Sequence, residues 1–341
     1  MMQRLPVWFG VLPWLAALVV PTAAMALDRT QLGVVVNTAD PLSVEIGRYY
    51  AEKRRIPFQN MLEVSFPPGR PIMTLGDFQA VKLQLDLQVP SEVQALALTW
   101  AVPYRVECMS ITTAFAFGFD LAYCATDCKP TRASPYFDSG TRRPYTQLHI
   151  RPTMAIAALS LKQAKALIDR GVRSDRTYPN GTAYLISTSD QARNVRSAFY
   201  PSTAQLLRGR LRFKLVRQDA LRDAKDVLFY FTGRERVDGL ETLGFVPGAI
   251  ADHLTSFGGA LTDGSQMSAL RWLEAGATGT YGTVVEPCNL PQKFPHPGVA
   301  IEHYLSGETL IEAYWKSVAM PGQGIFLGEP LAAPFARSMR R

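Results

Sequence analysis

Four residues in the C-terminal third of the chain carry side chains suited to nucleophilic catalysis. His253 and Ser256 are three residues apart in ADHLTSF, so they would share one face if this segment were helical. Cys288 follows the apolar run TGTYGTVVEP, and His296 comes shortly after it. A hydroxyl or thiol becomes an effective nucleophile when an adjacent base accepts its proton, so these residues are the candidates for an active hydrolase. A capping role for Ser256 and a disulfide for Cys288 are the alternatives.

The elements that would position these side chains form a β–loop–α–β unit between Asp226 and Pro287. DVLFYFTG is an apolar run closed by glycine, which is typical of a strand buried on both faces. MSALRWLEAG has the spacing of a helix, and TGTYGTVVEP that of a second strand. In open α/β sheets, ligands bind beyond the carboxyl ends of the strands. We therefore expect three loops to converge on a site: residues 232–238, 255–259 and 285–290.

The first half of the chain shows the same alternation of strands and helices. GVVVN predicts a strand, and VEIGRYYAEKRRIP predicts a helix. Asn37 ends the strand and Asp40 precedes the helix, so these two residues can hold a polar ligand or cap the helix. ALALTWAVPYRVE predicts a near-continuous strand over 95–107 that places Arg105 at the same rim. If Arg105 is buried it needs a carboxylate partner, for which Glu107, Asp40 and Glu286 are the candidates. The predicted fold class is α/β, a mostly parallel sheet flanked by helices in a doubly wound layout.

Residues 109–152 break this pattern and predict an irregular inserted loop region, rich in aromatic residues. These aromatics can stack on a sugar or a peptide, or form a small core of their own. The chain has four cysteines: Cys108 just before this stretch, Cys124 and Cys128 within it, and Cys288 beyond it. An even number of cysteines in an exported protein favours disulfides, and we expect one bridge within Cys108, Cys124 and Cys128, with the pairing open. No histidine at ligand spacing supports a zinc site there.

The first 26 residues have the features of a signal peptide. Arg4 begins it, an apolar segment follows, and Ala24-Met25-Ala26 matches a cleavage site, so the exported chain should begin at Leu27. We expect the protein in the periplasm or outside the cell. Residues 27–341 should form one large α/β domain or two lobes, an N-terminal lobe over 27–160 and a C-terminal lobe over 161–341.

The chain is moderately basic, with a formal net charge of +7. The basic residues gather where an exposed edge strand and a tail would be: Arg208, Arg210, Arg212 and Lys214, then Arg337, Arg340 and Arg341. Because no nucleic-acid motif accompanies them, we do not expect a nucleic-acid partner. No dinucleotide or Walker motif follows any strand, and no cluster of ligands predicts a metal, so we expect no cofactor and no metal.

The order of elements in the last third of the chain resembles the caspase-like peptidase fold, most nearly its gingipain-type branch. Active members carry a histidine base at the end of a strand like DVLFYFTG, and a nucleophilic cysteine before a glycine-rich turn. Here Arg234 and Ser256 occupy those places. Arginine stays protonated and cannot act as the base, so the resemblance implies a non-catalytic relative. Arg234 would then make the cleft positive and hold a carboxylate or phosphate.

Most of the chain also resembles an uncharacterised family of secreted bacterial proteins found in genomes with exosortase-type sorting systems. The segments that carry this resemblance include ADPLSVEIGRYYAEKRRIP, PGAIADHLTSFGG and GATGTYGTVVEP. We therefore predict an exported, non-catalytic caspase-like scaffold that binds a peptide, a glycan or another envelope ligand, with a link to protein sorting or exopolysaccharide export. The predicted ligand-binding residues are Arg234, Ser256, Asn37, Asp40, Arg105 and Glu286. The alternative is an active peptidase or esterase that uses Cys288 or Ser256 with His253 or His296.

Overall fold

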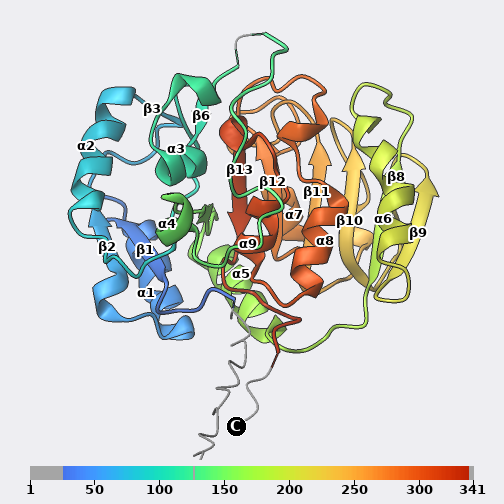
Figure 1. Ribbon diagram of the computed structural model, residues 1–341, viewed down its shortest axis with the longest axis horizontal. Coiled ribbons are helices and arrows are strands. Elements are labelled where there is room, and N and C mark those ends of the chain that lie inside the picture. Colours follow the sequence, from blue (N-terminus) through green and yellow to red (C-terminus); the bar gives the residue numbers. More distant parts are fainter. Residues whose placement is uncertain (1–25, 126, 338–341) are drawn as a thin grey trace, which may run out of the picture.

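The computed structural model describes residues 26–125 and 127–337 (Figure 1). The predicted signal peptide, except for Ala26, lies outside these residues, as do Arg340 and Arg341 of the predicted basic tail.

A ten-stranded sheet crosses the whole molecule in the order β2-β1-β4-β7-β13-β12-β11-β10-β8-β9 (Figure 1). Most neighbouring strands are parallel, and β13 runs antiparallel to β12. The strands are β1 (Leu32–Asn37), β2 (Met61–Val64), β4 (Ala95–Leu98), β7 (Thr153–Ala155), β8 (Thr182–Ser187), β9 (Arg212–Arg217), β10 (Val227–Gly233), β11 (Phe245–Leu254), β12 (Gly279–Thr283) and β13 (Gly324–Gly328). A small second sheet contains β3 (Ile72–Met73), β5 (Arg105–Val106) and β6 (Met109–Ser110).

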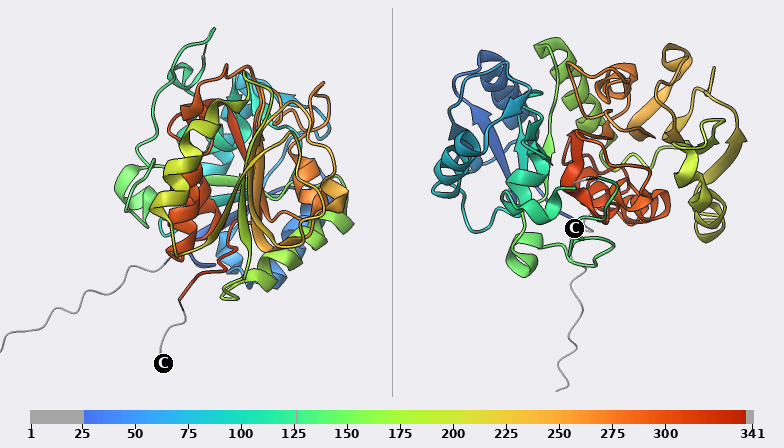
Figure 2. Two further views of the ribbon diagram at one scale, coloured as in Figure 1. Left: turned by 90° about the vertical axis from the view of Figure 1, so that its right-hand side faces the viewer. Right: turned by 90° about the horizontal axis from the view of Figure 1, so that it is seen from above.

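Helices cover both faces of the large sheet (Figure 2). They are α1 (Pro41–Arg54), α2 (Leu75–Asp86), α3 (Ile111–Phe117), α4 (Pro144–Leu148), α5 (Leu161–Ser174), α6 (Tyr200–Leu206), α7 (Leu270–Ala275), α8 (Pro297–Leu305) and α9 (Leu310–Lys316). On one face α1, α5 and α7 lie against the sheet, and α6 and α8 lie on the other. The predicted fold class, an α/β fold with a mostly parallel sheet flanked by helices, is confirmed.

Local sequence explains where these elements form. All seven residues of β10 are buried, as expected for a strand covered on both faces. Asp40 caps α1 by accepting a hydrogen bond from the Leu42 N–H, and Pro41 occupies the first turn, where its missing N–H costs nothing. The basic strand β9 lies at the edge of the sheet and exposes Arg212 and Lys214 to solvent, as predicted.

Three local predictions were wrong. The strand expected over 95–107 ends at Leu98, because the chain turns there and Arg105 joins β5 in the small sheet. The segment that contains His253 was expected in the loop of the β–loop–α–β unit, but it is the ten-residue strand β11, whose C-terminal half is buried. The region 109–152 is not irregular throughout, since it contains α3, capped by Ser110, and α4. In the part of the chain that is described, no helix is long and apolar enough to cross a membrane.

Candidate functional site

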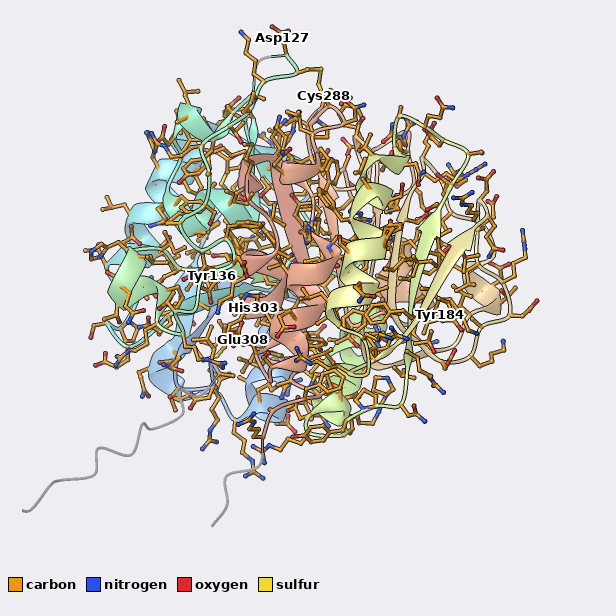
Figure 3. All side chains as sticks on the ribbon, turned by 45° about the vertical axis from the view of Figure 1, so that its right-hand side comes forward. Asp127, Tyr136, Tyr184, Cys288, His303 and Glu308 are labelled. Atoms are coloured by element: carbon orange, nitrogen blue, oxygen red, sulfur yellow. A yellow bond between two sulfur atoms is a disulfide. The ribbon has the colours of Figure 1, made fainter. Side chains whose placement is uncertain are left out.

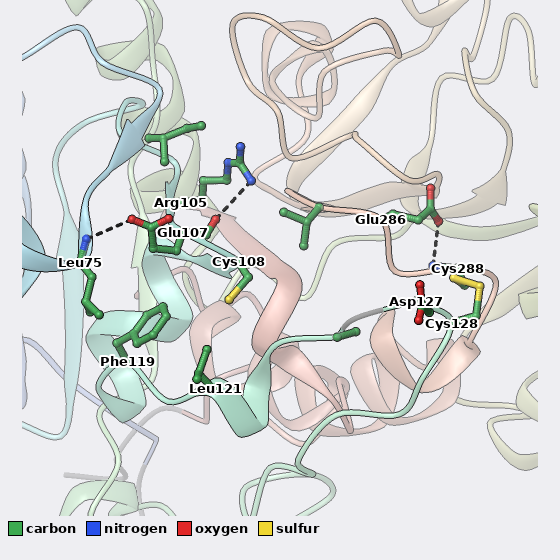
Figure 4. Close-up of a pocket in the computed structure, with 13 residues that line it drawn as sticks. Leu75, Arg105, Glu107, Cys108, Phe119, Leu121, Asp127, Cys128, Glu286 and Cys288 are labelled. Carbon is green, nitrogen blue, oxygen red and sulfur yellow. Dashed lines mark hydrogen bonds between the residues drawn. A yellow bond between two sulfur atoms is a disulfide. The ribbon is translucent and has the colours of Figure 1, made fainter.

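A cleft of about 940 Å³ opens where loops from the two sheets meet (Figure 4). One wall comes from the small sheet, the start of α2 and the segment after α3. It carries the apolar side chains Ile72, Leu75, Phe119 and Leu121, with Arg105 and Glu107 beside them. The loop after β12 forms the opposite wall with Val285, Glu286 and Cys288. The cleft therefore lies beyond the carboxyl ends of parallel strands, where ligands bind in open α/β sheets.

Two disulfides hold the walls of this cleft. Cys108 is bonded to Cys124, which confirms the predicted bridge within the first three cysteines. Cys128 is bonded to Cys288, and this bond joins residues 160 positions apart. Asp127 and Cys288 therefore lie together at the end of the molecule that carries the loops (Figure 3). Because Cys288 is in a disulfide, it offers no thiolate nucleophile.

A smaller cavity of about 370 Å³ adjoins the cleft on the other side of the Cys128–Cys288 disulfide. Arg193, Thr255 and Ser256 line it, and Glu286 lines both cavities. Arg193 forms an ion pair with Asp190 at 2.9 Å, and its Nε donates a hydrogen bond to Thr255 Oγ1 at 3.0 Å. Ser256 thus lines a cavity in which the guanidinium group of Arg193 is already paired with Asp190.

His253 is buried and both of its ring nitrogens are occupied. Its Nδ1 accepts a hydrogen bond from Trp272 Nε1 at 2.9 Å, so the proton is on Nε2, which lies 3.1 Å from the Met267 carbonyl oxygen. Burial lowers the pKa of His253 to about 3. The hydrogen bond to the Met267 carbonyl acts to raise this pKa, but its effect is smaller than that of burial. A histidine in this state cannot accept a proton from Ser256.

His296 is no better placed as a base. It caps α8, where its Nδ1 accepts a hydrogen bond from the Val299 N–H at 3.3 Å, and its ring packs against Phe199. Burial lowers the pKa of His296. Among the described residues, no hydrogen bond joins a histidine to a serine or cysteine side chain.

A buried ion pair lies near the C-terminal ends of β10 and β11. The side chains of Arg196 and Asp252 are each 1% exposed, and Arg196 Nη1 lies 2.5 Å from Asp252 Oδ1. Arg196 also donates to the Thr232 carbonyl oxygen at 2.7 Å, and Tyr314 donates to Asp252 at 3.1 Å. These bonds tie the ends of β10 and β11 to the segment that leads into α6.

Arg105 and Glu286 both line the large cleft, as the sequence suggested, but they do not pair with each other. Arg105 donates to the backbone carbonyl of Glu107 at 3.2 Å, while Glu286 accepts from the Cys288 N–H at 2.7 Å. Within the described ranges, no carboxylate forms an ion pair with Arg105. A carboxylate partner among Glu107, Asp40 and Glu286 was expected only for a buried Arg105, and Arg105 is only partly buried.

The other predicted ligand-binding residues lie away from the two cavities. Arg234 forms an ion pair with Asp219 and lines neither of them, so it does not make the cleft positive. Asn37 is buried, and its side chain bonds the backbone of Ala39 and Phe66. Asp40 caps α1. Asn37 and Asp40 thus organise the end of β1 rather than a cavity.

Asp127 and Lys293 lie near the cleft but had not been predicted. Asp127 is exposed and lines the cleft beside the disulfide. Lys293 is fully buried, and burial lowers its pKa to about 8, while Glu286 acts in the opposite direction. No sequence pattern marks either residue, since their positions depend on the Cys128–Cys288 bond and on packing. No group of three or more potential metal ligands occurs in residues 26–125 and 127–337.

The state of His253 predicts a dependence of stability on pH. In the unfolded chain its pKa should be near 6.5, so between pH 6.5 and 3 the unfolded state binds more protons. The contribution of His253 to the free energy of unfolding is complete above pH 6.5 and is lost as the pH falls toward 3. Urea unfolding of His253→Asn should show a shallower decline between pH 7 and 4.5 than the wild type.

The matched control is His149→Gln, which changes an exposed histidine and should keep the wild-type slope. NMR signals of the His253 ring that titrate near pH 6.5 in the folded protein would contradict the prediction.

Comparison with known proteins gave one structural likeness. No protein-family model and no curated protein matches the sequence. Among solved structures, the complex of the pro- and mature domains of RgpB from Porphyromonas gingivalis is similar, with a TM-score of 0.43 and 10% sequence identity. The match covers 89% of this chain and 79% of that one. The likeness is weak and concerns the overall fold.

Proposed function

We propose that this chain is an exported protein that binds a peptide in the large cleft and does not cleave it. The observation that carries the proposal is the cleft's combination of exposed apolar side chains with unpaired charges. Leu121 is 72% exposed and Ile72 is 38% exposed, although both are large and apolar. Exposed apolar side chains that line a concave surface are typical of binding sites.

The charges of the cleft favour a basic peptide. Glu107, Asp127 and Glu286 line it together with a single guanidinium group, that of Arg105. None of these four residues forms an ion pair with another described residue, so their charges are available to a ligand. Three carboxylates against one cation disfavour a phosphate or an anionic polysaccharide. A peptide with leucine or phenylalanine next to lysine or arginine would match both the apolar wall and the carboxylates.

The non-catalytic part of the proposal is supported by the side chains at the strand ends. Every described cysteine is in a disulfide, and His253 is neutral, buried and fully hydrogen-bonded. Neither candidate histidine can therefore act as the base that would activate Ser256.

Export is supported by the two disulfides, which persist in oxidising compartments. We further propose cleavage after Ala26, a single domain over 27–341 and a role linked to protein sorting in the cell envelope. These points rest on the sequence.

Peptide binding can be measured by fluorescence anisotropy with labelled pentapeptides that combine lysine with leucine or phenylalanine. We expect these to bind, and peptides with glutamate in place of lysine to bind at least tenfold more weakly. Glu286→Gln and Leu121→Ser should each weaken binding of the basic peptides by about tenfold, which corresponds to about 1.4 kcal/mol. Added salt should weaken peptide binding to the wild type more than to Glu286→Gln. The variant lacks the Glu286 carboxylate, so salt has one fewer charge–charge attraction to screen.

Arg234→Ala is the control, because this residue lies outside the cleft and its replacement should leave binding unchanged. Equal binding of basic and acidic peptides would contradict the proposal. Hydrolysis of peptide or ester substrates that disappears in Ser256→Ala would overturn its non-catalytic part.

A further inference from the structure

Within residues 26–125 and 127–337, every buried carboxylate but one has a cationic partner. Among the residues the structure describes, four carboxylate side chains are buried: Asp252, Glu308, Glu312 and Glu329. Asp252 pairs with Arg196, Glu308 with Lys316, and Glu329 with Arg54. Glu312 is 0% exposed and forms no ion pair with any described side chain. Burying an unpaired carboxylate is costly, so this exception calls for a partner.

The contacts of Glu312 show where that partner would lie. Its Oε2 accepts a hydrogen bond from the Thr309 N–H at 2.9 Å, which belongs to the capping box of α9, and another from the Thr309 hydroxyl at 2.6 Å. The same oxygen accepts a hydrogen bond from the backbone N–H of Leu27 at 3.1 Å. Its Oε1 is buried and has no hydrogen-bond partner in the described part of the chain. The carboxylate therefore has unused capacity next to the nitrogen of Leu27.

Leu27 is the residue at which the sequence predicts the exported chain to begin. Its side chain is 3% exposed and belongs to the core, so its nitrogen is fixed against α9. We propose that the α-ammonium group of Leu27, released by cleavage after Ala26, docks on Glu312 as its cationic partner. The site is thus a binding site for the chain's own new N-terminus.

The chemistry of the step is that of an ordinary peptide hydrolysis. A signal-peptide-removing protease adds water across the Ala26–Leu27 bond: the hydroxyl goes to the Ala26 carbonyl carbon, and a proton goes to the Leu27 nitrogen. The resulting amine takes up one further proton from solvent, because an α-amino group has an ordinary pKa of about 7.7–8.0. Cleavage thus replaces the Leu27 amide N–H, which has one hydrogen, by an ammonium group with three. Three hydrogens allow this group to donate to Glu312 Oε1 as well as to Oε2.

The cation beside Glu312 is Lys316, whose charge acts to lower the pKa of Glu312, but Lys316 is already paired with Glu308. Tyr136 and Glu308 face Glu312, and burial together with Glu308 raises the pKa of Glu312 while Leu27 is still in an amide bond. Glu308 Oε1 lies 2.8 Å from Lys316 Nζ and 3.5 Å from Arg142 Nη2. Glu308 Oε2 lies 3.1 Å from His303 Nδ1. Glu308 thus engages the neighbouring cations and leaves Glu312 to the N-terminus; Figure 3 labels His303 and Glu308 next to each other.

The test uses the exported protein with its native start. Intact-mass measurement should give a chain that begins at Leu27. Competitive acetylation of the N-terminal amine over a range of pH should then give a pKa at least one unit above the ordinary value, and acetylation at pH 7.5 at least tenfold slower than after unfolding. Glu312→Gln should restore an ordinary pKa and rate, whereas Glu45→Gln, which removes an exposed carboxylate, should change neither.

A second form keeps the proposal testable if Glu312→Gln does not fold. One extra glycine before Leu27 moves the ammonium group away while Glu312 remains, and its amine should react at the unfolded rate. A mature start other than Leu27 would overturn the proposal. So would an amine of the wild type that titrates normally and reacts as fast as in unfolded protein. Because none of these outcomes involves the cleft, they are independent of peptide binding.

Discussion

Replacing Arg196 by methionine is expected to lower the free energy of unfolding by about 3–5 kcal/mol, because it leaves Asp252 as a buried charge without a partner. Both side chains are 1% exposed, so water cannot take the place of the guanidinium group. The variant also loses the hydrogen bond to the Thr232 carbonyl oxygen at the end of β10. Urea unfolding followed by tryptophan fluorescence measures the change.

The double variant Arg196→Met/Asp252→Asn distinguishes the cost of the unpaired charge from the loss of packing. It should recover a large part of the stability, since no buried charge remains. Arg236→Met, at an exposed arginine, should change the free energy of unfolding by less than about 0.5 kcal/mol. A double variant as unstable as Arg196→Met would show that packing, not charge, is the cause.

Removing the Cys128–Cys288 disulfide is expected to destabilise the protein by about 5 kcal/mol, since a bond across 160 residues strongly restricts the unfolded chain. The double variant Cys128→Ser/Cys288→Ser avoids a leftover thiol. It should also weaken peptide binding, because the bond joins Asp127 and its neighbours to the loop after β12. Urea unfolding and the anisotropy assay measure the two effects.

Cys108→Ser/Cys124→Ser is the matched comparison. This disulfide joins residues only 16 positions apart, so its removal should cost about 3 kcal/mol. A larger loss for Cys108–Cys124 than for Cys128–Cys288 would contradict the loop-length argument and indicate that native packing around the bonds dominates.

The strands and helices could be predicted where burial and local signals agree. DVLFYFTG is apolar throughout because β10 is covered on both faces, and Asp40 with Pro41 marks the start of α1. The strand at Ala95 was predicted too long, since ALALTWAVPYRVE stays apolar beyond Leu98 while its residues become buried in the loop and in the small sheet. Apolar composition reports burial, and burial does not require a strand.

The candidate site was less predictable. His253 and Ser256 are close in sequence, yet β11 carries His253 into the core beside Trp272, and Ser256 faces a cavity. A side chain's hydrogen-bond partners come mostly from distant segments, so spacing along the chain could not show that both ring nitrogens of His253 are occupied. Arg234 was assigned to the cleft from the resemblance to caspase-like peptidases, whereas in the structure it forms an ion pair with Asp219.

By itself the sequence determined the fold class, the order of most strands and helices, the expected start at Leu27 and the bridge within the first three cysteines. These follow from local composition, from capping and from short distances along the chain. Only the tertiary structure decided that Cys128 bonds Cys288, that the cleft presents three carboxylates, and that the Leu27 nitrogen lies on Glu312. Each of these depends on contacts between residues more than 100 positions apart, which packing of the whole sheet brings together.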